Sequence, residues 1–143
     1  MSRITIHCPH CQFMNRLDTM RINDSLDCVR CKSDLLEEKP IDGTVVNLMG
    51  LTQSDKPILV KFWAHWCNAC SHFEPVFEAV SAQQPDVCFV KVDIQAQLSL
   101  GVQYNIRTIP TVMLFKQGKV VDTLNDALPK AQFNQWLQNA LLK

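Results

Sequence analysis

Beyond residue 43, apolar runs alternate with stretches in which apolar residues recur at helical spacing. The second kind predicts helices at 70–84, 95–104 and 129–142. The first kind predicts short β-strands within TVVNLM (44–49), PILVKFWA (57–64), DVCFVKVDI (86–94), TVMLF (111–115) and KVVDTL (119–124). Such alternation is typical of α/β proteins with a largely buried central sheet.

Two local patterns refine this prediction. Phe73, Val76, Phe77 and Val80 recur at helical spacing, so we expect them to face the sheet. FKQGKV (115–120) predicts a hairpin between the last two strands, with Gly118 in the turn.

Composition limits the class of protein. The 143 residues include 14 lysine and arginine and 14 aspartate and glutamate residues, so the formal net charge is zero. No global field therefore attracts nucleic acid or an anionic membrane. The N-terminus lacks the pattern of a secretory signal, and no apolar run reaches the ~18 residues of a membrane span. We expect a soluble, cytoplasmic protein with neither nucleic acid nor membrane as a partner.

The seven cysteines fall into two groups, with Cys88 alone in an apolar run where we expect a buried core thiol. In a reducing cytosol such thiols are metal ligands or catalysts more often than structural disulfides. Residues 32–43 are polar and contain Pro40 and Gly43, which favours a linker. We therefore expect one domain at 1–36 and a second at 37–143.

The first domain carries two CxxC pairs, and we interpret them as one structural zinc site. Its expected ligands are Cys8, Cys11, Cys28 and Cys31. So short a segment buries little apolar surface, and metal binding would supply the missing folding energy. A pair of disulfides or a redox-labile thiol cluster are the alternatives.

Other residues of this domain bear on that interpretation. His7 and His10 flank the first pair, and because four cysteines already complete the site we expect both histidines outside the ligand set. Arginines and a lysine allow a nucleic-acid-binding ribbon, but interleaved aspartates make that the minority interpretation.

Cys67 and Cys70, in HWCNAC (65–70), follow a predicted strand and open a predicted helix. A helix N-terminus stabilises an anion, so the pKa of the Cys67 thiol should fall and make it the nucleophile. Cys70, one turn later, is placed to resolve a mixed disulfide. This pair needs no bound organic cofactor. Packing alone or a second metal site are the alternatives, but no further CxxC remains to complete such a site.

The motifs ILVKFWAHWCNAC (58–70), VKVDI (90–94) and YNIRTIPTVMLFKQGKVV (104–121) resemble the thioredoxin family across residues 40–143. With the N-terminal CxxC pairs, the chain is most similar to the zinc-ribbon subgroup called thioredoxin 2 in bacteria. The resemblance implies a thioredoxin fold, a central mixed sheet flanked by helices, and reduction by an NADPH-dependent thioredoxin reductase. It further implies a cis peptide between Ile109 and Pro110 beside the cysteines, with the Ile109 backbone pairing with a substrate strand.

Two departures from the family bear on the site. Asn68-Ala69 stands where the family usually has Gly-Pro, so the potential of about −270 mV of thioredoxin cannot be assumed, and we favour a more oxidising couple. Lys61 stands where thioredoxins commonly have a buried aspartate, while Lys91 matches the lysine that accompanies it. Two buried ammonium groups are costly, so one should lose its proton, meet a carboxylate such as Asp93, or reach solvent.

Lys61 therefore has two interpretations: it tunes the cysteines, or it extends to solvent and contributes little. Trp66 beside Cys67 is expected at the surface rim, where it would line the substrate-binding surface, although packing is the simpler role. The sequence thus favours a protein-disulfide reductase acting as a cytoplasmic dithiol electron carrier. A more oxidising isomerase or oxidant, and a zinc-ribbon binding module on a passive scaffold, are the alternatives.

Overall fold

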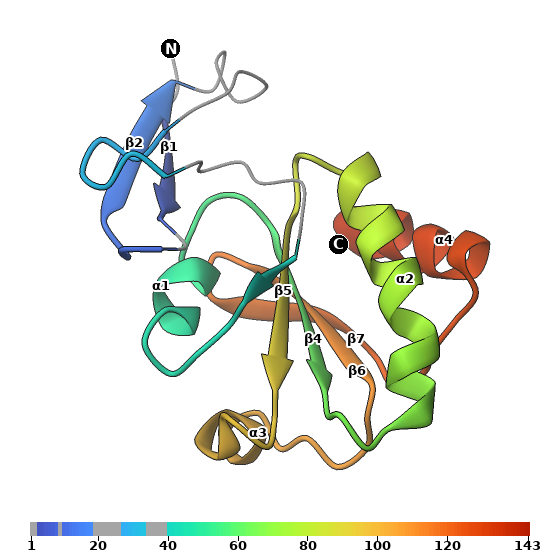
Figure 1. The fold of residues 1–143 in the computed structure, drawn as a ribbon. Helices are drawn as coiled ribbons and strands as arrows, with labels where there is room; N and C mark the ends of the chain where they lie inside the picture. Colours follow the sequence, from blue (N-terminus) through green and yellow to red (C-terminus); the bar gives the residue numbers. More distant parts are fainter. Residues whose placement is uncertain (1–2, 9, 19–26, 34–39) are drawn as a thin grey trace.

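Two β-sheets organise the computed structural model, which describes residues 3–8, 10–18, 27–33 and 40–143 (Figure 1). The smaller sheet pairs β1 (Arg3–His7) with β2 (Met14–Asp18) in antiparallel register. The larger sheet has the order β3-β5-β4-β6-β7. Its strands are β3 (Ile41–Asp42), β4 (Ile58–Trp63), β5 (Cys88–Asp93), β6 (Thr111–Lys116) and β7 (Lys119–Leu124).

The larger sheet is mixed, as expected. β5 runs parallel to both β3 and β4, whereas β6 is antiparallel to β4 and to β7. β4 is therefore a central strand with partners on both sides, and five of its six residues are buried. The site that follows β4 thus stands on a rigid element.

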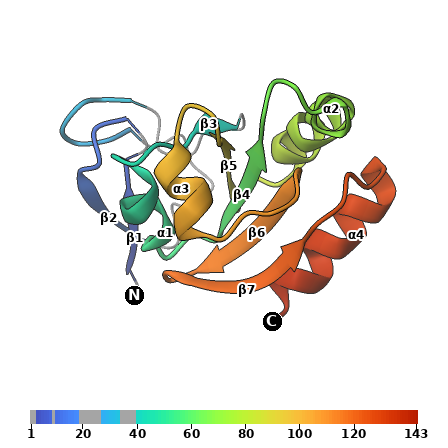
Figure 2. The ribbon, with the colours of Figure 1, turned by 90° about the horizontal axis from the view of Figure 1, so that it is seen from below.

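Helices cover both faces of this sheet (Figure 2). α2 (Asn68–Gln83) and α4 (Lys130–Leu141) pack on one face, and α1 (Leu48–Thr52) and α3 (Leu98–Gln103) on the other. Phe73, Phe77 and Val80 belong to the core beneath α2 and α4, as their spacing predicts. A second core, which includes Phe62 and Leu100, fills the opposite face.

The expected strand at 44–49 is wrong, because residues 45–47 form a turn and α1 begins at Leu48. The Asn47 amide accepts from the Thr44 N–H at 2.8 Å and donates to the Asp42 carbonyl oxygen at 3.0 Å. These local bonds compete with a strand ladder and bend the chain. Val45 and Val46 are exposed, so their apolar side chains do not mark a buried strand.

The expected hairpin between β6 and β7 is confirmed. Gly118 has φ = 83°, a left-handed conformation that an L side chain rarely adopts. Its N–H donates to the Thr52 carbonyl oxygen at 2.6 Å, which ties the turn to the end of α1.

The β1–β2 ribbon docks on the larger domain through the backbone of β1. Thr5 N–H donates to the Asp55 carboxylate at 2.7 Å, and Asp55 N–H donates to the Thr5 carbonyl oxygen at 2.9 Å. His7 N–H donates to Ser54 Oγ at 3.0 Å. These bonds cover the edge of β1 that β2 leaves open and fix the ribbon beside α1.

The expected boundary between residues 36 and 37 lies outside the described residues and stays a prediction. In Figure 1 the ribbon lies near the start of β4, whereas α2 follows the opposite end of that strand. Six residues of strand span roughly 20 Å, so the ribbon stands well away from the start of α2. Within the described residues, the structure contains no helix with the length and apolar character of a membrane span.

Candidate active site and metal centre

Cys67 and Cys70 lie where β4 passes into α2. Cys67 is the N-cap of α2, with extended backbone dihedrals, and its Sγ accepts a hydrogen bond from the Cys70 N–H at 3.1 Å. The two sulfurs form a disulfide across a Cα–Cα distance of 5.2 Å. Cys67 is 7% exposed and Cys70 only 2%, so Cys67 is the more accessible sulfur. Its place at the helix N-terminus favours its thiolate once the pair is reduced.

The loop before β6 forms one wall of the site. The Ile109–Pro110 peptide is cis, and the Ile109 carbonyl oxygen lies 3.7 Å from Cys67 Sγ. The Thr111 hydroxyl donates to the Thr108 carbonyl oxygen and lies 3.0 Å from Asn125 Oδ1, which fixes both ends of this turn. A backbone carbonyl is therefore held against the nucleophilic sulfur.

Trp66 and Trp63, on either side of Ala64-His65, have different environments. Trp66 precedes Cys67 and is 65% exposed, which agrees with the expected surface rim. Trp63 ends β4, and the His65 ring meets it edge-on at a centroid distance of 4.5 Å. The indole N–H of Trp63 is buried without a hydrogen-bond partner in the described structure.

Lys61 lies in the middle of β4 and is buried, with 2% of its surface exposed. The interpretation in which it extends to solvent is therefore wrong. Its Nζ lies 4.8 Å from the centre of the Phe77 ring of α2 and 6.0 Å from that of Trp63. Desolvation lowers the pKa of Lys61 to about 8, with a further decrease from Lys91, although Glu74 and Glu78 act in the opposite direction.

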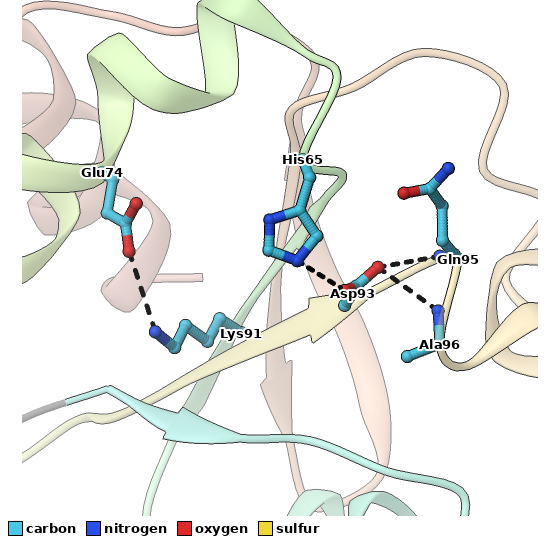
Figure 3. Close-up of polar contacts among 6 residues, drawn as sticks. All are labelled: His65, Glu74, Lys91, Asp93, Gln95 and Ala96. Carbon is cyan, nitrogen blue, oxygen red and sulfur yellow. Dashed lines mark hydrogen bonds and ion pairs between the residues drawn. The ribbon is translucent and has the colours of Figure 1, made fainter.

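Lys91 takes a different partner from the one suggested by the sequence (Figure 3). Its Nζ lies 3.7 Å from Glu74 Oε1 of α2. Asp93 instead faces His65 Nε2 at 3.2 Å and accepts from the N–H groups of Gln95 and Ala96. Asp93 thus caps the turn after β5, and Glu74 balances the lysine charge.

Sequence reasoning missed Glu74, although a signal was present. Cys70 and Glu74 are four residues apart, which places them on one side of a helix. The pairing of His65 with Asp93 had no such local signal, because it joins the ends of β4 and β5. Cys88 is half-buried rather than a fully buried core thiol, because it occupies the first position of β5.

Two surface cavities flank the site. One of about 520 Å³ lies beside the Ile109 turn and is lined in part by Arg107, Thr111 and Asn125. The other, of about 350 Å³, is lined in part by Trp63, Lys91 and Asp93. Each cavity opens at the surface, so the dithiol stands beside a protein surface rather than in a deep small-molecule pocket.

In the ribbon, the sulfurs of Cys8, Cys11, Cys28 and Cys31 all lie within 4.8 Å of one another. Cys8 Sγ lies 3.5 Å from Cys31 Sγ, and Cys11 Sγ lies 3.6 Å from Cys28 Sγ. A zinc ion with Zn–S bonds of about 2.3 Å would need sulfurs about 3.8 Å apart. The spacing therefore fits a tetrahedral four-thiolate metal site.

The same backbone hydrogen bond closes both CxxC pairs. The residue after each second cysteine, Gln12 or Lys32, has φ = 67° and donates its N–H to the carbonyl of Cys8 or Cys28 at 2.9 Å. In the same places of the two turns, His10 N–H and Arg30 N–H each donate to a cysteine sulfur at 3.4 Å. Backbone donors therefore point at the sulfurs, as thiolate ligands of a metal require.

The four thiols do not share one electrostatic environment. Burial raises the pKa of Cys8 to about 12. Burial also opposes the thiolate of Cys28, but hydrogen bonds from Cys31, Asn15 and Arg30 outweigh it and lower the pKa to about 6. Four thiolates at these distances repel one another, so a bound cation is needed to hold all of them deprotonated.

The His7 side chain contacts the larger domain. Its Nδ1 lies 3.4 Å from Ser54 Oγ of the larger domain. The four cysteines alone make up the metal-ligand group found in the described part of the chain.

A thiol pair at the N-terminus of α2, facing a cis-proline turn on a mixed sheet, defines a thiol–disulfide exchange site. Comparison with known proteins agrees: the thioredoxin family model matches residues 48–139. Thioredoxin C-3 of Corynebacterium nephridii is 33% identical over 137 residues, which cover 95% of this chain and 94% of that protein. Thioredoxin 1 of Synechococcus elongatus is 42% identical over 90 residues, which cover 62% of this chain and 84% of that protein.

Solved structures give the same result. A thioredoxin of Malassezia sympodialis is 30% identical, with a TM-score of 0.64 over 71% of this chain and 92% of its own. The chain belongs to the thioredoxin family, and it is a thiol–disulfide oxidoreductase. The match to the Corynebacterium protein is long enough to include most of the N-terminal ribbon.

Proposed function

We propose that this protein is a zinc-ribbon thioredoxin, of the kind called thioredoxin 2 in bacteria, that reduces disulfides in cytoplasmic proteins. The observation that carries the proposal is the placement of Cys67 at the N-terminus of α2, 3.7 Å from the Ile109 carbonyl oxygen. The cytoplasmic location is supported by the four ribbon cysteines, since a reducing compartment keeps such thiols available for metal.

The reaction transfers two electrons from the dithiol to a protein disulfide. The Cys67 thiolate attacks one sulfur of the substrate disulfide, and the other substrate sulfur leaves as a thiolate. The Cys70 thiolate then attacks Cys67 Sγ, which releases the second substrate sulfur and leaves the Cys67–Cys70 disulfide seen here. A thioredoxin reductase that uses NADPH returns the pair to the dithiol.

The substrate strand binds against the turn that contains Ile109 and Pro110. The Ile109 backbone faces the site and pairs with an extended substrate segment, while Pro110 donates no N–H that would compete for it. Trp66, next to Cys67 in the chain, supplies an exposed aromatic surface. Substrate recognition is therefore mostly through backbone and shape, which suits varied protein disulfides.

Lys61 acts on the dithiol through its charge. It lies beneath α2 with its Nζ against Phe77, and a pKa of about 8 leaves most of it protonated at pH 7. A buried positive charge below the helix that carries Cys70 favours the thiolate forms of the pair. Stabilising the reduced form makes the couple more oxidising.

The ribbon binds one structural zinc ion through Cys8, Cys11, Cys28 and Cys31. The donor set is soft and closed, so zinc would crosslink the two turns and offer no open position for catalysis. The proposal includes no organic cofactor, nucleic acid or membrane. It gives the ribbon a stabilising role, because the ribbon lies at the end of the sheet away from the dithiol.

A second candidate, an isomerase or oxidant, is favoured by two departures from the usual site. Lys61 and the Asn68-Ala69 dipeptide both differ from the usual thioredoxin site, and Lys61 acts in the oxidising direction. A passive scaffold with a binding ribbon would carry out no exchange at all.

Insulin reduction by dithiothreitol tests the proposal. We expect the zinc-loaded protein to accelerate it strongly over dithiothreitol alone and Cys67→Ser to abolish the acceleration. Cys88→Ser, which alters a thiol outside the site, is the matched control and should retain activity. No acceleration by the unmodified protein would support the passive scaffold. Turnover with insulin but none with NADPH and thioredoxin reductase would contradict the reductant role.

A further inference from the structure

Asn15, the second residue of β2, is a buried polar residue that neither the dithiol chemistry nor the four ligands account for. It follows the first cysteine turn directly and pairs in register with Ile6 of β1. Asn15 has only 2% of its surface exposed. A buried amide is costly unless its donors and acceptor are satisfied, so its contacts indicate what it does.

The Asn15 side chain joins the two cysteine turns. Its Nδ2 donates to the Phe13 carbonyl oxygen at 3.1 Å, at the end of the first turn. The same Nδ2 lies 3.5 Å from Cys28 Sγ, and Oδ1 accepts from the Val29 N–H at 3.1 Å, both in the second turn. One planar group thus bridges two segments that are more than ten residues apart in the chain.

The backbone does not supply this link. Within each turn, the N–H groups of His10 and Arg30 point at the first cysteine of their own pair. These bonds shape each pair separately and do not set the distance between the pairs. Among these hydrogen bonds to sulfur, the one from Asn15 is donated by a side-chain N–H and crosses from one turn to the other.

We propose that Asn15 is a positioning residue of the metal centre, holding the Cys28–Cys31 turn against the Cys8–Cys11 turn and donating a hydrogen bond to the Cys28 sulfur. This inference depends on the proposed metal site. The amide is chemically selective: an aspartate of the same shape would still accept from Val29 but would place a negative charge against a thiolate. Partners of this kind are typically worth 10- to 100-fold in metal affinity.

Asn15→Asp in the full-length protein separates this role from a general need for a buried amide. Asn47→Asp is the matched control, because Asn47 is also buried, at 7% exposed, and also bridges two backbone groups, but in the larger domain. Zinc affinity is measured by competition with a chromophoric chelator. Cobalt titration reports whether the bound site is a tetrahedral thiolate site.

We expect Asn15→Asp to lower zinc affinity by about 10- to 100-fold while Asn47→Asp leaves it unchanged. Asn15→Ser, which removes the donor without adding charge, should bind cobalt with a tetrahedral spectrum but with reduced affinity. This variant decides the question if the aspartate variant binds no metal. Wild-type affinity in Asn15→Ser, or in Asn15→Asp, would overturn the inference.

The experiment also distinguishes failure of the inference from failure of the larger proposal. If the unmodified protein binds neither zinc nor cobalt, the metal centre fails and the role of Asn15 fails with it. If the unmodified protein binds zinc and both Asn15 variants match it, only the role of Asn15 fails. Insulin reduction should be unaffected by either Asn15 variant, because the dithiol lies at the far end of β4.

Discussion

Lys61 of β4 stands directly opposite Lys91 of β5 in the parallel register, yet only Lys91 has a carboxylate partner within ion-pair distance in the described structure. Lys91 reaches Glu74 of α2, whereas Lys61 packs its ammonium group against Phe77. The difference follows from burial, because Lys91 is partly exposed and Lys61 is not. Burying the Lys61 ammonium group in the core is costly, so it should affect both the free energy of unfolding and the chemistry of the cysteine pair.

The stability of the oxidised protein should rise when Lys61 is replaced by methionine. The pKa of Lys61 falls from 10.5 to about 8 on folding, so below pH 8 the folded state must carry a proton in a desolvated site. At about 1.4 kcal/mol per pKa unit, Lys61→Met should add about 3 kcal/mol at pH 7.

The gain in stability from Lys61→Met should depend on pH. Between pH 8 and 10.5 the unfolded chain binds the proton and the folded protein does not, so the stability cost disappears as pH rises. The advantage of Lys61→Met should therefore fall below about 1 kcal/mol at pH 10. Urea unfolding at pH 7 and at pH 10 measures this difference in the free energy of unfolding, with Lys91→Met as the control. An advantage that does not change with pH would contradict the argument.

The thiolate of the reduced site should become less stable in the same variant. Lys61 lies beneath α2, so removing its positive charge should raise the pKa of the Cys67 thiol. By Coulomb's law, a unit charge ~10 Å from a thiol in a medium of effective dielectric constant ~20 is worth about one pKa unit, which sets the scale of the expected rise. Ultraviolet absorbance of the thiolate, followed against pH, measures the pKa of Cys67. Lys119→Met, at the start of β7, is the charge-matched control. Equal pKa values in all three proteins would exclude a role for Lys61.

Loss of Cys28 should release the metal and leave the dithiol intact. Cys28→Ser removes one of four ligands, so zinc bound by the purified protein should fall to the background of a chelator-treated sample. Insulin reduction should stay within about twofold of wild type, because the ribbon docks at the start of β4 and the dithiol follows its end. Loss of insulin reduction together with loss of zinc would show that the two domains are coupled.

The docking of the ribbon depends on Asp55, whose carboxylate accepts from the Thr5 N–H and lies 3.5 Å from Gln117 Nε2. Asp55→Ala should weaken the attachment by about 1 kcal/mol, since the contact is exposed. Hydrogen exchange of the Thr5 amide should then accelerate about fivefold. Asp126→Ala is the control, because the Asp126 carboxylate accepts a hydrogen bond from the N–H of its neighbour Ala127. This variant should not accelerate exchange of the Thr5 amide. Unchanged exchange in Asp55→Ala would mean that the backbone bonds suffice.

Most of the fold and of the site could be predicted from local sequence patterns. HWCNAC predicted the passage from β4 to α2, and the spacing of two CxxC pairs predicted the sulfur cluster. The cis peptide before Pro110 came from the family resemblance. Each of these depends on residues close together in sequence or on a motif that fixes its own geometry.

Long-range contacts could not be predicted in this way. The pairing of His65 with Asp93 joins the ends of β4 and β5, and that of Lys91 with Glu74 depends on how α2 packs over β5. The spacing of Cys70 and Glu74 puts Glu74 on the side of the helix that carries the resolving cysteine, but it does not identify Lys91 as the partner. The strand expected at 44–49 failed because Thr44 and Asn47 form local side-chain bonds that overcome the β-propensity of two exposed valines. Asn15 gave no signal, because a single asparagine in a strand is ordinarily exposed.

The most direct test of the reductant role is the equilibrium reduction potential of Cys67 and Cys70. Trp66, exposed beside Cys67, reports the redox state by fluorescence in glutathione or dithiothreitol buffers, with zinc retained. We expect a potential between about −270 and −220 mV, more oxidising than thioredoxin but still reducing. A potential at or above about −180 mV, as in disulfide isomerase, would contradict the reductant role and assign the site to isomerisation or oxidation.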